Sequence, residues 1–135
     1  MNKKIHSAGF TLVELLIVIV ILGLLGSIVA PRMLSKVSTA RDQVAKSQMQ
    51  VIATALDSHR LDVSYYPETL QELRQSDKKG WDGPYFPKQI PLDPWNNAYV
   101  YENKPNSNTG EGFTLKSLGR DGKLGGEGED ADVEF

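Results

Sequence analysis

The chain has 135 residues, of which 40% are apolar and 24% are charged, and its formal net charge is −2. So small a net charge, without a basic cluster along the chain, argues against nucleic acid as a partner. The lack of cysteine excludes disulfides and thiolate chemistry, and it leaves the redox compartment open. The length allows one small globular region beside a membrane segment.

A long apolar run occupies residues 10–30, in which the only polar side chains are Thr11, Glu14 and Ser27. A helix of about 20 such residues is long enough to cross a bilayer. The run therefore predicts one membrane span. Glu14 is unusual in it, because no basic residue inside the run can pair with this ionisable side chain.

The residues before the run predict its orientation. Lys3 and Lys4 form a short positive region, so residues 1–9 should stay in the cytoplasm while the rest of the chain faces outward. A secretory signal would have its small-residue cleavage site after a shorter apolar region. Here the small residues Ala8 and Gly9 stand before the run instead.

The segment Gly9-Phe10-Thr11-Leu12-Val13-Glu14 resembles the class III leader junction of the type IV pilin and type II secretion pseudopilin superfamily. This resemblance implies that a prepilin peptidase cuts after Gly9, that Phe10 becomes the methylated amino terminus, and that Glu14 serves in assembly. An unpaired carboxylate in hydrocarbon costs about 2.5 to 3.5 kcal/mol, which a neighbouring subunit's positive amino terminus would offset. The alternative is a plain signal anchor in which Glu14 reaches the membrane interface.

The helix should continue beyond the span as an amphipathic one over residues 32–64. Pro31 should kink or locally melt it, because proline lacks an N–H and clashes with the preceding turn. Apolar side chains then recur at three- and four-residue spacings, among them Leu34, Val37, Val44, Met49, Ile52 and Leu56. This stripe needs a cover, so the rest of the chain should fold against it.

The segment from Tyr65 should stop the long helix and begin a short one, with Pro67 in its first turn and Leu70 and Leu73 on its apolar face. A loop rich in proline, glycine and aromatic residues follows over residues 80–97. Its aromatic side chains should cap the small core, with ligand stacking as the alternative: Trp81, Tyr85 and Trp95.

Two runs of alternating apolar residues, 98–102 and 112–117, are separated by a segment rich in Asn, Gly and Ser. This pattern predicts a β-hairpin over residues 98–117, joined by one or two short strands from the loop or the tail. The predicted fold class is α+β, with the long N-terminal helix packed on a small antiparallel sheet.

The tail over residues 117–133 combines glycines with acidic side chains, namely Asp121, Glu127, Glu129, Asp130 and Asp132. Carboxylates and free backbone carbonyls are the ligands that calcium prefers. The spacing is not that of an EF-hand. The residues alone leave open whether this segment binds calcium or is an acidic, solvated tail.

Further blocks resemble those of the type II secretion major pseudopilins, in the order that family has them: Tyr65-Tyr66-Pro67, Gly83-Pro84-Tyr85, Leu92-Asp93-Pro94-Trp95, Ser117-Leu118-Gly119-Arg120-Asp121-Gly122 and Gly126-Glu127-Gly128-Glu129-Asp130-Ala131-Asp132. The resemblance covers nearly the whole chain. It implies a type IV pilin-like fold whose C-terminal loop holds calcium through Asp121, Asp130 and Asp132, with main-chain oxygens near Leu118 and Lys123.

The chain departs from that family in two places. The segment after Pro67 is shorter than usual, and the tryptophan often found near the family's C-terminus is missing, so Val133 or Phe135 would have to replace it. The predicted organisation is a leader (1–9), a transmembrane and assembly helix (10–31), its amphipathic continuation (32–64) and a globular α/β region (65–135), which includes the hairpin (98–117) and the calcium loop (117–133).

The sequence predicts no enzyme, because His6 and His59 are the only histidines and the carboxylates gather in the tail. The resemblance implies a major pseudopilin, anchored in the bacterial inner membrane with a cytoplasmic N-terminus and a periplasmic C-terminal domain. It would polymerise into a periplasmic filament that drives protein export.

The implied partners are other copies of the chain in a helical homopolymer, minor pseudopilins, the inner-membrane secretion platform and the prepilin peptidase. A type IV pilin or minor pilin is the first alternative, although the usual type IV pilin carries a pair of cysteines near its end that this chain lacks. An alternative of another class is a membrane-anchored, calcium-dependent binding module or enzyme.

Overall fold

The computed structural model describes residues 9–108 and 110–135, so the predicted leader lies outside the described residues except for Gly9. Two compact units divide the chain, Met1–Val37 and Ser38–Phe135. Within the described residues the elements are a long helix, two short 3₁₀ helices and three strands, in the order α1 (Leu12–Val63), η1 (Leu70–Leu73), β1 (Val100–Glu102), β2 (Thr114–Ser117), η2 (Gly128–Asp130) and β3 (Val133–Glu134).

In the first unit, every residue of α1 from Leu12 to Val37 is exposed. This part of the helix holds a stretch that is long and apolar enough to cross a membrane, and none of that stretch is buried. An exposed apolar surface of this size is typical of a segment that contacts lipid or other protein. The helix continues through Pro31, and the bend expected at this proline stays a prediction.

In the second unit, one face of α1 is buried along its length from Ala45 to Val63, as the amphipathic pattern predicts. The predicted stripe was too long at its start, because Leu34, Val37 and Val44 are 70%, 45% and 48% exposed. Leu34 and Val37 precede the part of the helix that the rest of the chain covers, whereas Val44 comes after Arg41, which contacts the tail, and lies on the uncovered side of the helix. The helix ends inside the predicted range, where Ser64 adopts a positive φ of 76°.

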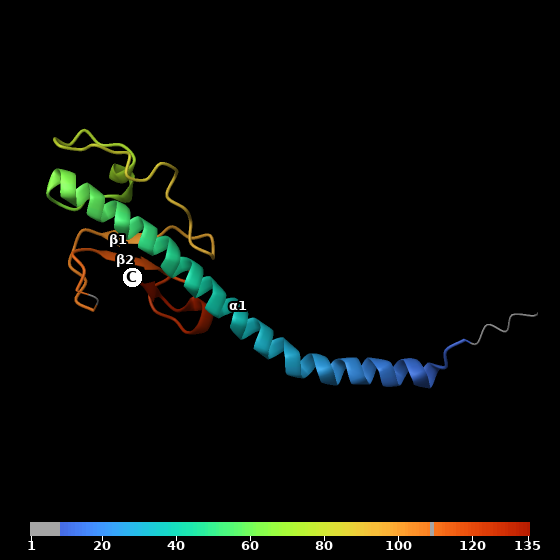
Figure 1. The fold of residues 1–135 in the computed structure, drawn as a ribbon. Coiled ribbons are helices and arrows are strands. Elements are labelled where there is room, and N and C mark those ends of the chain that lie inside the picture. Colours follow the sequence, from blue (N-terminus) through green and yellow to red (C-terminus); the bar gives the residue numbers. More distant parts are fainter. Residues whose placement is uncertain (1–8, 109) are drawn as a thin grey trace, which may run out of the picture. The chain divides into compact units, whose positions relative to one another are not determined.

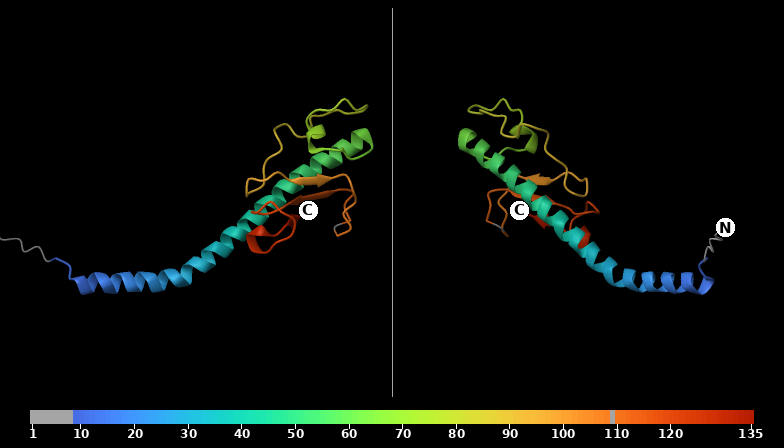
Figure 2. Two further views of the ribbon diagram at one scale, coloured as in Figure 1. Left: turned by 180° about the vertical axis from the view of Figure 1, so that it is seen from behind. Right: turned by 45° about the vertical axis from the view of Figure 1, so that its right-hand side comes forward.

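The three strands form an antiparallel sheet in the order β1-β2-β3. Tyr101 pairs with Leu115, which confirms the predicted hairpin, and Ser117 pairs with Val133, so the third strand comes from the tail. Figure 1 and Figure 2 show β1 and β2 beside the C-terminal half of α1. Buried side chains of that helix and of the sheet share one core.

The short helix after the stop is a 3₁₀ turn that begins at Leu70, so the placement of Pro67 in its first turn was wrong. The reason is that residues before it are held by β1 and by the residue that follows this strand. The Tyr101 hydroxyl donates to the Pro67 carbonyl at 2.7 Å, and the Asn103 side-chain amide donates to the Tyr66 carbonyl at 3.0 Å. Leu70 and Leu73 are buried as predicted.

Aromatic side chains of residues 80–97 dock as predicted. Tyr85 and Trp95 pack against the core, and the Trp81 indole N–H donates to the Glu72 carbonyl at 2.8 Å. His59 is fully buried under this loop, with its ring 5.6 Å from that of Tyr85.

The end of the chain also packs on the core. Val133 is buried, and the Phe135 ring stacks on Phe113 at a centroid distance of 5.9 Å. These two side chains supply the apolar anchor of the tail.

Candidate functional site

The start of α1 is a reciprocal hydrogen-bonded cap built from Thr11 and Glu14. The Thr11 N–H donates to Glu14 Oε2 at 2.7 Å, and the Glu14 N–H donates to Thr11 Oγ1 at 3.2 Å. This capping box satisfies backbone donors that a helix start leaves open. It also turns the Glu14 carboxylate back toward the N-terminal end of the helix.

Gly9 and Phe10 lie immediately before that cap. Both residues are exposed, and Phe10 is 85% exposed. The junction predicted to be cut is therefore accessible and adjoins the Glu14 carboxylate in the chain, ahead of the first helical turn. In this segment the exposed junction that is predicted to be cut, an acidic side chain and a long apolar surface follow one another.

The tail forms a loop that closes on itself after β2. The Arg120 N–H donates to the Glu129 carbonyl at 2.8 Å. Gly119 makes this closure possible, because its φ is 66° and a Cβ there would lie only 2.7 Å from the Ala131 carbonyl oxygen. The predicted ligand residues Asp121, Asp130 and Asp132 all lie on this loop.

Charged side chains join the loop to the helix. Arg41 on α1 contacts Glu129 at 2.8 Å, and Arg120 contacts the same carboxylate at 3.2 Å. Arg120 also binds Asp130 through two parallel hydrogen bonds of 3.0 and 3.1 Å. These hydrogen bonds to Asp130 raise the pKa of the Arg120 guanidinium above its ordinary value.

The other predicted ligands differ in their surroundings. Asp132 Oδ1 is buried and has no hydrogen-bond partner within the described part of the chain. Asp121 is exposed, and its Oδ1 accepts the Lys123 N–H at 3.0 Å. Leu118 is half-buried just after β2.

These groups do not form a ready-made metal cage. Among residues 9–108 and 110–135, no three histidine, cysteine or acidic side chains gather closely enough to hold a metal ion. The donor chemistry nonetheless suits calcium, because all the groups are hard oxygens and one of them, Asp132 Oδ1, is buried without a partner.

A buried aspartate fixes the root of the tail loop. Asp93 is only 4% exposed, and its carboxylate accepts the Ser117 hydroxyl and the backbone N–H groups of Trp95 and Asn97. The Asn97 side-chain amide in turn donates to the Gly119 carbonyl at 2.7 Å. The loop of residues 92–97 thus holds the chain where it leaves β2.

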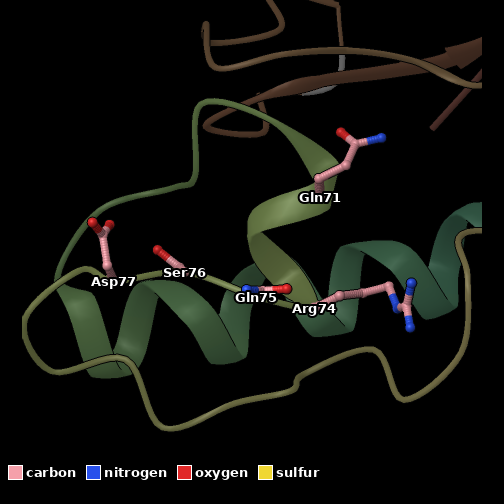
Figure 3. A pocket seen from close by; sticks show the side chains of 5 residues that line it. All are labelled: Gln71, Arg74, Gln75, Ser76 and Asp77. Carbon is pink, nitrogen blue, oxygen red and sulfur yellow. The ribbon is translucent and has the colours of Figure 1, made fainter.

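A shallow polar hollow lies next to η1, lined by Gln71, Arg74, Gln75, Ser76 and Asp77. Figure 3 shows Arg74 and Asp77 at opposite ends of this group, with their side chains pointing away from each other. The side chains do not converge on one centre, so the hollow offers no acid–base pair.

The sequence analysis did not identify three residues that hold the tail loop in place, namely Arg41, Asp93 and Arg120. Arg120 lies inside a quoted block and could have been noticed as a cation next to Asp121. The Arg41–Glu129 pair joins residues 88 positions apart, and the sequence carries no local signal for it. The role of Asp93 in holding Ser117 also depends on tertiary contact.

Two family models match the chain. Residues 32–135 match the model described as type II secretion system protein G, and residues 5–30 match the model described as the prokaryotic N-terminal methylation motif.

Individual proteins agree with these matches. Relatives named type II secretion system core protein G are 41% identical in Pseudomonas aeruginosa, over 97% of this chain and 96% of the relative, and 39% identical in Vibrio cholerae, over 98% and 94%. The crystal structure of the major pseudopilin from the type 2 secretion system of enterohaemorrhagic Escherichia coli is 26% identical, with a TM-score of 0.58 over 73% of this chain and 85% of that one.

Proposed function

The chain belongs to the type II secretion system protein G family and is a structural subunit of the pseudopilus, and we propose that it polymerises through the first part of α1. The observation that carries this proposal is the exposed apolar surface of α1 from Leu12 to Val37, which begins at the Glu14 cap. Lipid covers this surface before assembly, and the helices of neighbouring copies cover it afterwards.

Glu14 makes the exchange of lipid for protein selective. Its carboxylate is costly in hydrocarbon, and the cap with Thr11 relieves only part of that cost, because its hydrogen bonds leave the negative charge in place. A positive amino terminus created at Phe10 of a neighbouring copy would neutralise it. The contact between Glu14 and that amino terminus then determines both which chain binds and how the two helices are aligned along their length.

Processing precedes assembly in this proposal. The prepilin peptidase cleaves after Gly9 and methylates Phe10, and the match to the N-terminal methylation motif supports this step. Mass spectrometry of the chain purified from membranes should find a methylated chain that begins at Phe10. An unprocessed chain in cells that contain the peptidase would contradict the assignment.

The same proposal places the chain in the inner membrane, with its N-terminus in the cytoplasm and residues 38–135 in the periplasm. Its partners are other copies, minor pseudopilins and the secretion platform. The family is a structural one, and we propose that the chain has no catalytic activity of its own. The match to protein G favours this role over that of a type IV pilin.

The charge of Glu14 can be tested without disturbing the helix start. Glutamine also forms a capping box, so Glu14→Gln should preserve α1 and membrane insertion while it removes the charge. We expect loss of filaments on electron micrographs of cells that overproduce the chain with its secretion components. Glu102→Gln, an exposed change on β1, is the matched control. Filament yield equal to that of the control would overturn the role of Glu14.

We further propose that the tail loop binds calcium as a structural ion. Asp121, Asp130 and Asp132 would supply side-chain oxygens, and main-chain oxygens near Leu118 and Lys123 would complete the set. The support is the hard-oxygen chemistry of the loop and the buried, unpartnered Oδ1 of Asp132. When bound, calcium would supply a divalent charge that links acidic groups otherwise repelling one another.

Calcium binding should stabilise the folded chain, because an ion that binds the native state alone adds its binding free energy to the stability. At a calcium concentration one hundred times the Kd, the gain is about 2.7 kcal/mol. Thermal unfolding of the full chain in detergent, followed by tryptophan fluorescence, should shift down when a chelator is added.

Asp121→Asn should weaken that response, whereas Asp77→Asn, an exposed change in another loop, should leave it intact. Magnesium in place of calcium serves as the ion control, since it prefers a smaller and more rigid site. An unchanged melting temperature on chelation, together with no heat of calcium binding, would refute the proposed calcium site.

A further inference from the structure

Arg120 is the cation that Asp130 contacts in this structure. Its guanidinium meets both carboxylate oxygens, with Nε 3.0 Å from Oδ1 and Nη2 3.1 Å from Oδ2. The third nitrogen, Nη1, lies 3.2 Å from Glu129 Oε2. A forked pair of this kind is the strongest geometry available to an arginine and a carboxylate.

This pairing occupies one of the predicted calcium ligands, Asp130. A guanidinium against both oxygens of Asp130 puts a positive charge where an incoming cation would bind, and like charges at that distance repel. Asp132 lacks such a partner, and its Oδ1 is left buried and unpaired. The Asp130 carboxylate is therefore paired with a cation, while one oxygen of Asp132 has no hydrogen-bond partner among the described residues.

We propose that Arg120 is an internal counterion that competes with calcium for Asp130 and so sets the calcium affinity of the tail loop. This inference rests on the proposed calcium site. Binding exchanges one cation for another at Asp130: the guanidinium leaves the carboxylate, and the ion takes its place.

The displaced Arg120 does not lose every contact, because Glu129 stays within its reach. Arg41 on α1 holds the other oxygen of Glu129, with Nη1 2.8 Å from Oε1. The Arg41–Glu129 pair therefore keeps the loop attached to α1 in both states. Arg120 stabilises the loop without metal and lowers the loop's affinity for metal.

Calcium titration calorimetry on the full chain in detergent tests this exchange. Exposed ion pairs are weak, so Arg120→Gln should tighten the Kd by about two- to fivefold. Arg120→Lys keeps the charge but loses the fork, and it should also tighten the Kd, by less. Arg41→Gln removes a nearby charge without freeing Asp130, so its Kd should stay within about twofold of the original value.

Melting temperatures separate exchange from a merely structural role. Arg120→Gln should melt lower than the original chain in chelator, and the lowering should be smaller in saturating calcium, because the pair with Asp130 exists in the metal-free state alone whereas the contact with Glu129 is lost in both. Equal lowering in both conditions would show that Arg120 supports the loop in both states, and this would overturn the proposal.

The remaining outcomes are distinct. If Arg120→Lys binds calcium like the original chain while Arg120→Gln binds more tightly, the positive charge at position 120 weakens binding by repulsion alone. The proposed exchange at Asp130 is then wrong. If all variants bind calcium equally, the Arg120 proposal fails and the calcium site stands. If none binds, the calcium site itself is refuted.

Discussion

Replacing Asp93 with alanine should be among the most damaging single changes in the globular unit. Its carboxylate accepts three hydrogen bonds, from the hydroxyl of Ser117 and from the backbone N–H groups of Trp95 and Asn97. The residue is only 4% exposed, so water cannot readily replace the lost acceptor. Each unsatisfied buried donor costs about 1 to 3 kcal/mol, and these costs do not simply add.

We therefore expect Asp93→Ala to lower the free energy of unfolding by about 3 to 5 kcal/mol, a large share of the roughly 5 to 15 kcal/mol typical of a domain. Urea unfolding of the full chain in detergent, followed by tryptophan fluorescence, measures this quantity. Ser117→Ala removes one of the three bonds and should cost about 1 kcal/mol. A loss below about 1 kcal/mol for Asp93→Ala would refute the argument that these bonds hold the root of the tail.

Two further predictions concern the backbone of the tail and the buried tyrosines. Gly119→Ala should cost more than about 2 kcal/mol, because it combines a positive φ with a Cβ only 2.7 and 2.8 Å from two carbonyl oxygens. Gly125→Ala, with a positive φ but open space around it, should cost only about 1 kcal/mol in the same urea assay, and equal losses would contradict this reading. Burial raises the pKa of Tyr101, so the unfolded chain ionises first and stability should fall as the pH rises above about 10. Tyr101→Phe should make that alkaline decline shallower while costing about 1 kcal/mol at neutral pH for the lost bond to Pro67, and an unchanged slope would count against the burial effect.

The sequence predicted those features that depend on local pattern. The long apolar run after Phe10 marked the candidate membrane stretch, and the three- and four-residue spacing of Met49, Ile52 and Leu56 marked the buried face of α1. Alternation on both sides of a polar turn marked β1 and β2. Each of these patterns lies within the sequence of the element that it predicts.

Features that depend on tertiary contact were less predictable. The start of η1 was misplaced because Tyr101 on β1 and Asn103 just after it hold the chain near Pro67, and the local sequence around Pro67 gives no indication of these contacts. The buried stripe was begun too early, since periodicity gives the face of a helix but not the point at which other segments begin to cover it.

The candidate site also has features that the local sequence predicts and features that depend on tertiary contact. Thr11 and Glu14 have the spacing of a capping box, but the sequence analysis pointed to Glu14 through its charge in an apolar run and through the resemblance to a leader junction, and not through the cap. The acidic composition of the tail suggested a calcium site, and the family resemblance supplied the predicted ligands. Neither indicated that Asp130 is paired with Arg120, because side-chain pairing follows from how the loop closes.

The pairing of the last strand ties the tail to the core. β3 forms one edge of the sheet, Val133 pairs with Ser117 of β2, and the Phe135 N–H donates to the Leu115 carbonyl at 3.1 Å. The loop of residues 118–132 therefore begins and ends in two strands that are hydrogen-bonded to each other. A change that loosens this loop also loosens one edge of the sheet, so damage in the tail is transmitted to the core.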